Sequence, residues 1–384
     1  MSTAPKGTRG AASRAGTTNR AHRTAACRTS LTVRLWVEGC QGLHGAERGS
    51  TLRGALKSLS IGQWGGLTAA LCCHVEFPTI YAKALDLALF RAFGVPEVSK
   101  VAFGSGEFKR DPAKRYADTD LLLCEMTEQH YASARGQEAL RRLNFIHSHF
   151  SIRNDDMIYT LSLFILEPAR WANWYDFRAF TKLEKDAVFN YWYQIGIGMD
   201  IRDIPTSYEA LDEWNTHYEK GHLRFGKTNA SIRDATLALM VSDFPPLLRN
   251  FARKTAIIIM DDPLTTAMGL ELPPLWMEGL VAAAMWLRKQ TVGWLLPPRP
   301  LSMATGRTLK TALPYCTGMR LAATFPIRAA GSNAVHAVYP ETYAISDLGP
   351  PRMGKGLGPL GTGSGKLYRG TGGSTSRCPI ARQA

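Results

Sequence analysis

Residues 141–166, RRLNFIHSHFSIRNDDMIYTLSLFIL, contain the pattern that decides the fold. Leu140, Leu143 and His147 are spaced at i, i+3 and i+7, so they share one face of a predicted helix. A histidine that faces a protein interior needs a partner for its ring nitrogens, because burying an unpaired polar group costs free energy. A carbonyl, a carboxylate or a metal ion would meet that need. For a lone histidine on an apolar face, a satisfied core residue is the default interpretation.

The segment 61–298 is predicted to be all-α, with nine or ten helices, because apolar residues recur at helical spacing and strand-like alternation is scarce. Residues 181–184 (TKLE) and 206–209 (TSYE) have the spacing of capping boxes. Asn154, followed by two aspartates, is expected to cap the helix that starts there. Proline pairs mark further helix starts at 245–246 and 273–274.

The charge of the chain divides it into three parts. The formal net charge is +14, but residues 1–60 hold a balance of +8 and residues 299–384 one of +9, whereas 61–298 hold −3. A nucleic-acid-binding domain would carry its basic residues on a folded surface, so nucleic acid is not expected as a partner. We predict one large helical domain at 61–298, a disordered leader at 1–60 and an irregular, Gly-rich basic tail at 299–384, of which residues 350–384 are expected to be disordered.

The leader and the cysteines bear on location. The leader is basic and rich in Ser, Thr and Ala, which is compatible with a transit peptide, a disordered leader or a misassigned gene start. Seven scattered cysteines without a CxxC pair favour a reducing compartment or a cytosol-facing membrane surface. No uninterrupted apolar stretch of about 20 residues is present. The nearest, 67–95, is broken by charged residues that include Arg91.

A second polar pattern, KRYADT at 114–119, precedes His147. In a helix, Arg115 and Thr119 would share a face at i and i+4. From the pattern alone, an exposed ion pair between Arg115 and Asp118 is the default interpretation.

Taken together, these segments resemble the ER-bound oxygenases of the mycophenolic-acid type and the latex-clearing rubber oxygenases, which share a catalytic domain. The resemblance covers about residues 67–300. It is carried by VEFPTIYAKALDLALFRAFGVPEVSK at 75–100, KRYADT at 114–119, RRLNFIHSHFSIRNDDMIYTLSLFILEP at 141–168 and LTTAMGLELPP at 264–274.

The resemblance implies an oxidoreductase that uses haem b, with globin-like helical packing around the haem pocket. Its expected reaction is the cleavage or oxidation of a C=C bond in a hydrophobic isoprenoid or prenyl chain, with dioxygen, in secondary metabolism. His147 in NFIHS corresponds to the axial ligand of the haem iron, and Arg115 and Thr119 to catalytic polar groups near the haem. Arg142 is a further candidate, for pairing a haem propionate. The chain departs at Asp118, where the rubber oxygenases have a lysine, which leaves the sixth coordination position of the iron open to question.

Two other functions stay open: a haem-free helical protein that binds a lipid or prenylated metabolite without turnover, and a non-haem metal enzyme that uses His147 with nearby acids. The eukaryotic relatives are ER-bound, so an intracellular location at the ER membrane, with peripheral contact through apolar and basic surfaces, is expected.

Rival motifs receive structural interpretations. The E-x-x-H motif at 219–222 is predicted to end a helix, because di-iron bundles need two such motifs and two further glutamates. The aspartate pairs at 155–156 and 261–262 lack the third acid of a magnesium motif and are interpreted as helix starts. His149 is expected to point away from His147.

Overall fold

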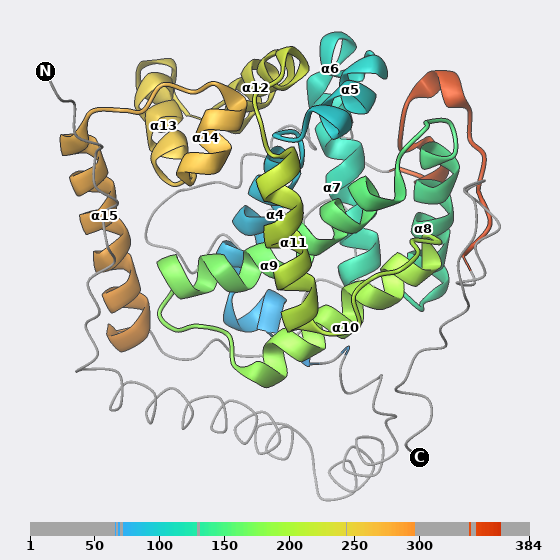
Figure 1. Ribbon diagram of the computed structural model, residues 1–384, viewed down its shortest axis with the longest axis horizontal. Helices are drawn as coiled ribbons and strands as arrows, with labels where there is room; N and C mark the ends of the chain where they lie inside the picture. The colour runs from blue at the N-terminus through green and yellow to red at the C-terminus, as the bar shows by residue number, and fades with distance from the viewer. Residues whose placement is uncertain are drawn as a thin grey trace, which may run out of the picture. The chain divides into compact units, whose positions relative to one another are not determined.

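Helices, and no β-strand, make up the described part of the chain (Figure 1). The computed structural model describes residues 66, 68–69, 72–128, 131–242, 244–295, 338 and 343–361, all within one compact unit that starts at Leu59. The all-α prediction is confirmed. The α-helices of the described residues are α4 (Pro78–Ala92), α5 (Pro96–Gly104), α6 (Glu107–Arg110), α7 (Pro112–Glu128), α8 (Ala134–His147), α9 (Asn154–Tyr175), α10 (Lys182–Gly198), α11 (Tyr208–His222), α12 (Lys227–Met240), α13 (Pro246–Ile258), α14 (Asp262–Met268) and α15 (Leu275–Gln290).

Four short helical turns complete the described secondary structure. They are the π-helical η1 (Cys72–Glu76) and η2 (Thr291–Leu295) and the 3-10 turns η4 (Ile345–Asp347) and η5 (Pro351–Met353). The α-helices exceed the nine or ten expected, because α6 and α14 are too short to produce a periodic apolar pattern.

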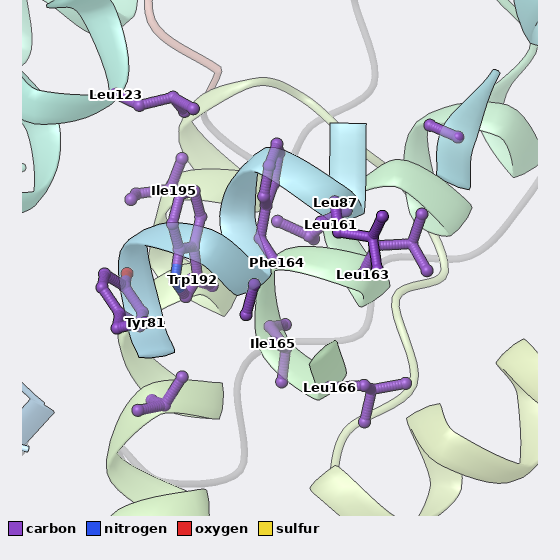
Figure 2. Packing of buried hydrophobic residues seen from close by; sticks show 14 of the residues in the cluster. Tyr81, Leu87, Leu123, Leu161, Leu163, Phe164, Ile165, Leu166, Trp192 and Ile195 are labelled. Carbon is purple, nitrogen blue, oxygen red and sulfur yellow. The ribbon is translucent and has the colours of Figure 1, made fainter. Parts of the chain in front are cut away.

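Helix α9 forms the centre of the core. Leu163, Ile165 and Leu166 are each fully buried although they point in different directions around the helix axis. A helix that is apolar on all sides has to be covered on all sides, and α9 packs against α4, α10 and α11. Phe164 stacks on Trp192 of α10 with ring centroids 4.9 Å apart (Figure 2). The core therefore forms between α9 and the helices that cover it.

The capping box at the start of α10 is confirmed. Thr181 accepts a hydrogen bond from the Glu184 amide, and the Glu184 carboxylate accepts one from the Thr181 amide. The box predicted at 206–209 is wrong by one residue. The capping side chain belongs to Ser207, which accepts from the Ala210 amide at 3.1 Å.

Asn154 does not cap α9, so that prediction is wrong. The cap position is Arg153, and the Asn154 amide side chain instead exchanges two hydrogen bonds with the backbone of Arg202, at 2.9 and 3.0 Å. An asparagine amide pairs with a peptide group as well as it caps a helix, and here a segment 48 residues away supplies that peptide group.

The remaining predicted helix boundaries agree with the structure. Helix α13 begins at Pro246, α15 follows Pro274, and α14 begins at Asp262 with Asp261 as its capping residue. The E-x-x-H motif ends α11 at His222.

Part of the Gly-rich tail is folded, which corrects the prediction of disorder for residues 350–361. The Gly358 amide donates to the Arg141 carbonyl at 2.9 Å, and the Gly361 amide donates to the Gly198 carbonyl at 2.7 Å. These bonds hold the tail against the ends of α8 and α10. Residues 1–60, 299–337 and 362–384, for which disorder or irregular structure was also predicted, lie outside the described residues.

Candidate functional site

His147 is the last residue of α8, the helix that carries the central motif. Ser133 begins this helix by accepting a hydrogen bond from the Gly136 amide at 3.0 Å. Leu140, one of the residues predicted to share the face of His147, is 1% exposed. His147 itself is partly exposed, but its Nδ1 atom is buried and has no hydrogen-bond partner. The described residues therefore supply neither the carbonyl nor the carboxylate that would satisfy this nitrogen in a purely structural role.

Burial, followed by the positive charge of Arg115, lowers the pKa of His147 from 6.5 to about 4. Both effects disfavour the protonated ring. At neutral pH the imidazole is therefore uncharged, and this is the form that donates a lone pair to a metal ion.

This depressed pKa makes a testable contribution to stability in protein without bound metal. The unfolded histidine takes up its proton near pH 6.5 and the folded one only near pH 4, so this group's contribution is fully present above pH 6.5 and is lost as pH falls through that window. Between pH 7 and pH 4, wild type should lose at most about 3 kcal/mol more unfolding free energy than His147→Gln. Urea unfolding of both proteins at several pH values measures the difference. An identical pH dependence in the two proteins would contradict the assignment.

Arg115 and Thr119 lie one turn apart on α7, as the spacing predicts. Asp111 starts this helix by accepting a hydrogen bond from the Lys114 amide at 2.9 Å. Arg115 Nη1 donates to Thr119 Oγ1, and the Thr119 hydroxyl donates to the Arg115 carbonyl at 3.1 Å. Burial lowers the pKa of Arg115. The charge of Arg115 acts on His147 across the α7–α8 contact, and Thr119 is joined to Arg115 by hydrogen bonds.

Asp118 has a different partner from the one expected. Lys114 Nζ donates to both carboxylate oxygens of Asp118 at 2.9 Å, and Asp118 is 5% exposed. The exposed Arg115–Asp118 ion pair considered from the sequence is therefore wrong: Arg115 bonds to Thr119, and the aspartate forms a largely buried pair with the lysine four residues before it.

Arg142 of α8 is buried against the C-terminal segment. It is 1% exposed, and its Nε, Nη1 and Nη2 atoms donate to the carbonyls of Leu348, Gly356 and Gly354 at 2.7 to 2.8 Å. The guanidinium group is engaged by the backbone of the C-terminal segment. These bonds hold the chain itself, and the pairing of Arg142 with a haem propionate stays a prediction.

The other histidines near the motif have local partners. His149 is exposed, and its Nδ1 lies 2.7 Å from the Phe145 carbonyl. His222 Nδ1 lies 3.0 Å from the Tyr218 carbonyl. Within the described ranges, no group of three or more His, Cys, Asp and Glu side chains is arranged to hold a metal ion. This part of the chain therefore offers no acidic ligand set for a non-haem metal beside His147.

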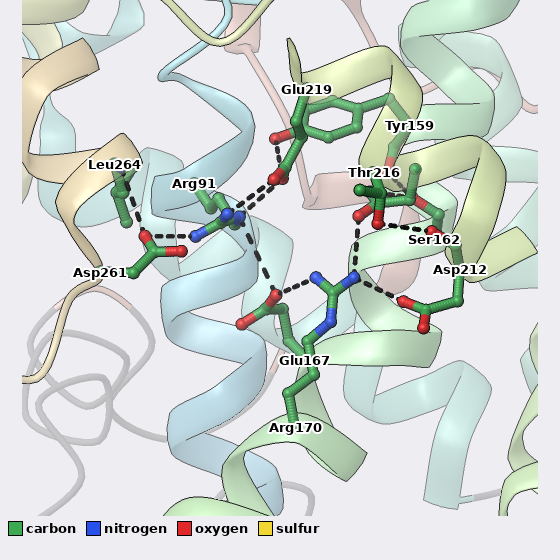
Figure 3. A network of polar contacts seen from close by, with 11 residues as sticks. Arg91, Tyr159, Ser162, Glu167, Arg170, Asp212, Thr216, Glu219, Asp261 and Leu264 are labelled. Carbon is green, nitrogen blue, oxygen red and sulfur yellow. Dashed lines mark hydrogen bonds and ion pairs between the residues drawn. The ribbon is translucent and has the colours of Figure 1, made fainter. Parts of the chain in front are cut away.

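A buried polar network was not found from the sequence. Arg91 of α4 donates to both carboxylate oxygens of Glu219 at 2.7 Å and to Asp261 at 2.7 Å, and it lies 3.9 Å from Glu167 (Figure 3). The sequence signal for this network was Arg91, a charged residue within the apolar stretch 67–95. Its partner Glu219 is the glutamate of the E-x-x-H motif. The network joins α4, α9, α11 and the start of α14.

Comparison with known proteins shows which family this chain belongs to. Residues 71–289, more than half of the chain, match the family described as "ER-bound oxygenase mpaB/B'/Rubber oxygenase, catalytic domain". The chain belongs to this oxygenase family. The match contains α7 and α8, and with them Arg115, Thr119 and His147.

Three curated relatives in the oxygenase family show how much of the chain is shared. ER-bound oxygenase mpaB' of Penicillium brevicompactum is 27% identical over 328 residues, in a match that covers 74% of this chain and 77% of the relative. ER-bound oxygenase mpaB of Penicillium roqueforti is 28% identical over 213 residues, 51% of this chain and 72% of the relative. The mpaB of P. brevicompactum is 28% identical over 237 residues, 60% of this chain and 57% of the relative.

Proposed function

We propose that this oxygenase-family protein is a haem-dependent enzyme in which His147 is the axial ligand of the iron. The observation that carries the proposal is the buried Nδ1 of His147, which has no partner although the ring is neutral at physiological pH. Haem iron takes a neutral imidazole as axial donor, and the pocket around the imidazole tunes the iron. The residues present therefore fit the group.

Each side chain would have a separate task. His147 would hold the iron, and the bound haem would supply the activation of dioxygen. Arg115, held by its bond to Thr119, would place a guanidinium group next to the reacting atoms, where developing negative charge is stabilised most strongly in a site without water. Asp118 has no amine nitrogen that could take the place of the lysine of the rubber oxygenases. Both of its carboxylate oxygens accept hydrogen bonds from Lys114.

For the substrate we propose a hydrophobic isoprenoid or prenyl chain and dioxygen. The support for this substrate class is membership of a family whose description names a rubber oxygenase. In the simplest balanced reaction, both bonds of one C=C are broken and each carbon takes one oxygen atom of O₂ as a carbonyl, so no external reductant is consumed.

The visible spectrum tests the haem proposal. We expect the full chain, expressed with a supply of haem, to show a Soret band that His147→Ala loses or shifts. His149→Ala is the matched control, because that histidine lies two residues further on and is exposed. It should leave the band unchanged.

Two results would contradict the proposal: the absence of a Soret band in wild type, or a band unaffected by His147→Ala. Binding of a prenylated aromatic by haem-free protein without oxygen uptake would favour the alternative, a protein that binds such metabolites without turning them over.

For localisation we propose peripheral contact with a membrane, that of the endoplasmic reticulum, since the relatives carry the name ER-bound. No described helix combines the length and the apolar character needed to span a bilayer. The support is an exposed apolar surface on the packed pair α13 and α15 and the adjoining η2. It includes Leu247, which is 91% exposed, and Trp276, Trp286 and Trp294, which are 63 to 73% exposed. Tryptophan concentrates at membrane interfaces.

Lys254 of α13 and Lys289 of α15, which form no ion pair among the described residues, add positive charge that suits the anionic surface of a cytoplasmic leaflet. Arg253 and Arg288 on the same helices are paired with Asp234 and Asp176. We expect the full chain to sediment with phosphatidylcholine–phosphatidylserine vesicles, and a Trp276→Ala/Trp286→Ala variant to bind them about tenfold less. The control is Leu183→Ala, because Leu183 is 69% exposed on α10. Equal sedimentation of all three proteins would contradict this surface.

A further inference from the structure

The C-terminal segment 343–361 lies outside the matched residues 71–289, yet it bonds to the helix that carries His147. Arg142 of α8 donates three hydrogen bonds to its carbonyls. Asn144 Nδ2 donates to Pro359 at 2.9 Å and also to the Gly198 carbonyl of α10 at 2.9 Å. The last two turns of α8 are therefore bonded to this segment directly. Figure 1 shows the segment, in orange-red, running beside α8.

Three glycines let the segment approach α8 at backbone distance. A Cβ on Gly349 would lie 2.5 Å from the Ile146 side chain, and one on Gly356 would lie 2.3 Å from the Phe145 ring. A Cβ on Gly358 would meet backbone, with the Phe145 amide nitrogen 2.8 Å away. Contacts this short are not tolerated, so glycine is required wherever the neighbour cannot give way. The glycine content that suggested disorder is what makes the packing fit.

Most of the contacts between the segment and α8 lie away from His147, although Asn144, which bonds to Pro359, is only about 60° from His147 around the helix axis. At 100° per residue, Arg142 and Phe145 point roughly 140–160° away from His147 around the helix axis. The His147 side faces α7, which packs against α8 and carries Arg115. The segment therefore contacts α8 mainly on the side away from His147, and α7 packs against the side that carries His147.

The segment is also bonded to α7 and to the helices before it. Tyr343 OH donates to Glu125 Oε1 at 2.5 Å, and Lys114 Nζ donates to the Gly349 carbonyl at 3.3 Å. Arg352 donates to the Ser105 carbonyl at 2.5 Å. One stretch of chain thus spans α7 and α8, the two helices that supply the candidate site.

We propose that residues 343–361 are a positioning segment, which fixes the end of α8 against α7 and so sets the place of the His147 ring beside Arg115. The inference rests on the proposed function, because that function explains why the place of the His147 ring matters. The place of the ring itself can be measured without haem. Gly356, Gly358 and Arg142 are its positioning residues.

The test uses the haem-free full chain with ¹³C-labelled histidine. The ring Cε1–H signal of His147, assigned by its loss in His147→Gln, is recorded at fixed pH 7. Gly358→Ala is expected to shift this signal and to raise amide hydrogen exchange at residues 141–147 about fivefold, the effect of losing about one backbone hydrogen bond. The signal of His222, on α11, should stay in place. Gly104→Ala is the control, because a Cβ there meets nothing within 4 Å.

A rescue separates positioning from a general loss of structure. Gly356→Ala should shift the His147 signal because the new methyl group collides with the Phe145 ring. In Gly356→Ala/Phe145→Ala that ring is absent, and the signal should return to its position in Phe145→Ala alone. If Gly358→Ala does not fold, Arg142→Lys provides a milder change, since a single ammonium group cannot reproduce the three bonds to separate carbonyls.

An unmoved His147 signal in Gly356→Ala and Arg142→Lys would overturn the inference, whether or not exchange in α8 increases. The haem spectrum is a separate readout. A shifted histidine signal in a protein that never binds haem would support the positioning segment and refute the proposed function. A normal Soret band in a protein whose His147 signal does not move would support the proposed function and refute the positioning segment.

Discussion

Replacing Arg91 by methionine is expected to lower the free energy of unfolding by about 3–5 kcal/mol. Arg91 is 5% exposed, and its two bonds to Glu219 and one to Asp261 are all 2.7 Å long (Figure 3). Methionine has a similar length but no charge, so it leaves the carboxylates of Glu219 and Glu167 without this counter-charge. The buried Tyr159 hydroxyl, which donates to Glu219 at 2.9 Å, cannot replace it.

Chemical denaturation with urea measures this effect. Lys182→Met is the matched control, because Lys182 also pairs with glutamate but is 73% exposed, and no measurable change is expected. Arg91→Met/Glu219→Gln should be more stable than Arg91→Met, since the glutamine removes a stranded charge. Equal stability of Arg91→Met and wild type would show that the network contributes nothing net.

Replacing Arg115 by glutamine is expected to reduce substrate-dependent oxygen uptake about 100-fold while the haem spectrum persists. Glutamine keeps a hydrogen-bond donor but has no positive charge and a shorter reach. In the proposed site, Arg115 stabilises developing negative charge and His147 alone holds the iron. Activity and haem binding should therefore separate at this residue.

Oxygen uptake with a prenylated aromatic substrate, compared at equal Soret absorbance, measures the loss. Arg110→Gln is the control, because Arg110 lies on the neighbouring α6 and its side chain is 57% exposed. In haem-free protein, Arg115→Gln also removes the second cause, after burial, of the lowered pKa of His147, which should rise from about 4. Full activity in Arg115→Gln would remove Arg115 from the catalytic residues.

Local patterns allowed much of the fold to be predicted. The Thr181 capping box, the proline-marked helix starts and the apolar face of α8 depend on residues within one or two turns of each other, and the structure contains all three. Arg115 and Thr119 were likewise recognisable, because their spacing is that of one helical turn. The resemblance was placed at about residues 67–300, and the family match covers 71–289.

Features that depend on distant partners were missed. Asn154 pairs with a backbone 48 residues away, Arg91 with carboxylates 128 and 170 residues away, and Arg142 with carbonyls more than 200 residues away. Nothing next to these residues in the sequence distinguishes them from a helix cap, an interruption or a free cation. The glycines after 349 were misjudged for the same reason, since the close approach that requires them involves another part of the chain.

The three carbonyls around Arg142 bear on how this protein is produced in the laboratory. An expression fragment trimmed to the boundaries 71–289 would keep the arginine and delete all three of its acceptors. The guanidinium group of Arg142 would then have to be rehydrated, and α8 would fray from the end that carries His147. Inactivity of such a fragment would therefore say nothing about the full chain, and fragments should extend to at least residue 361.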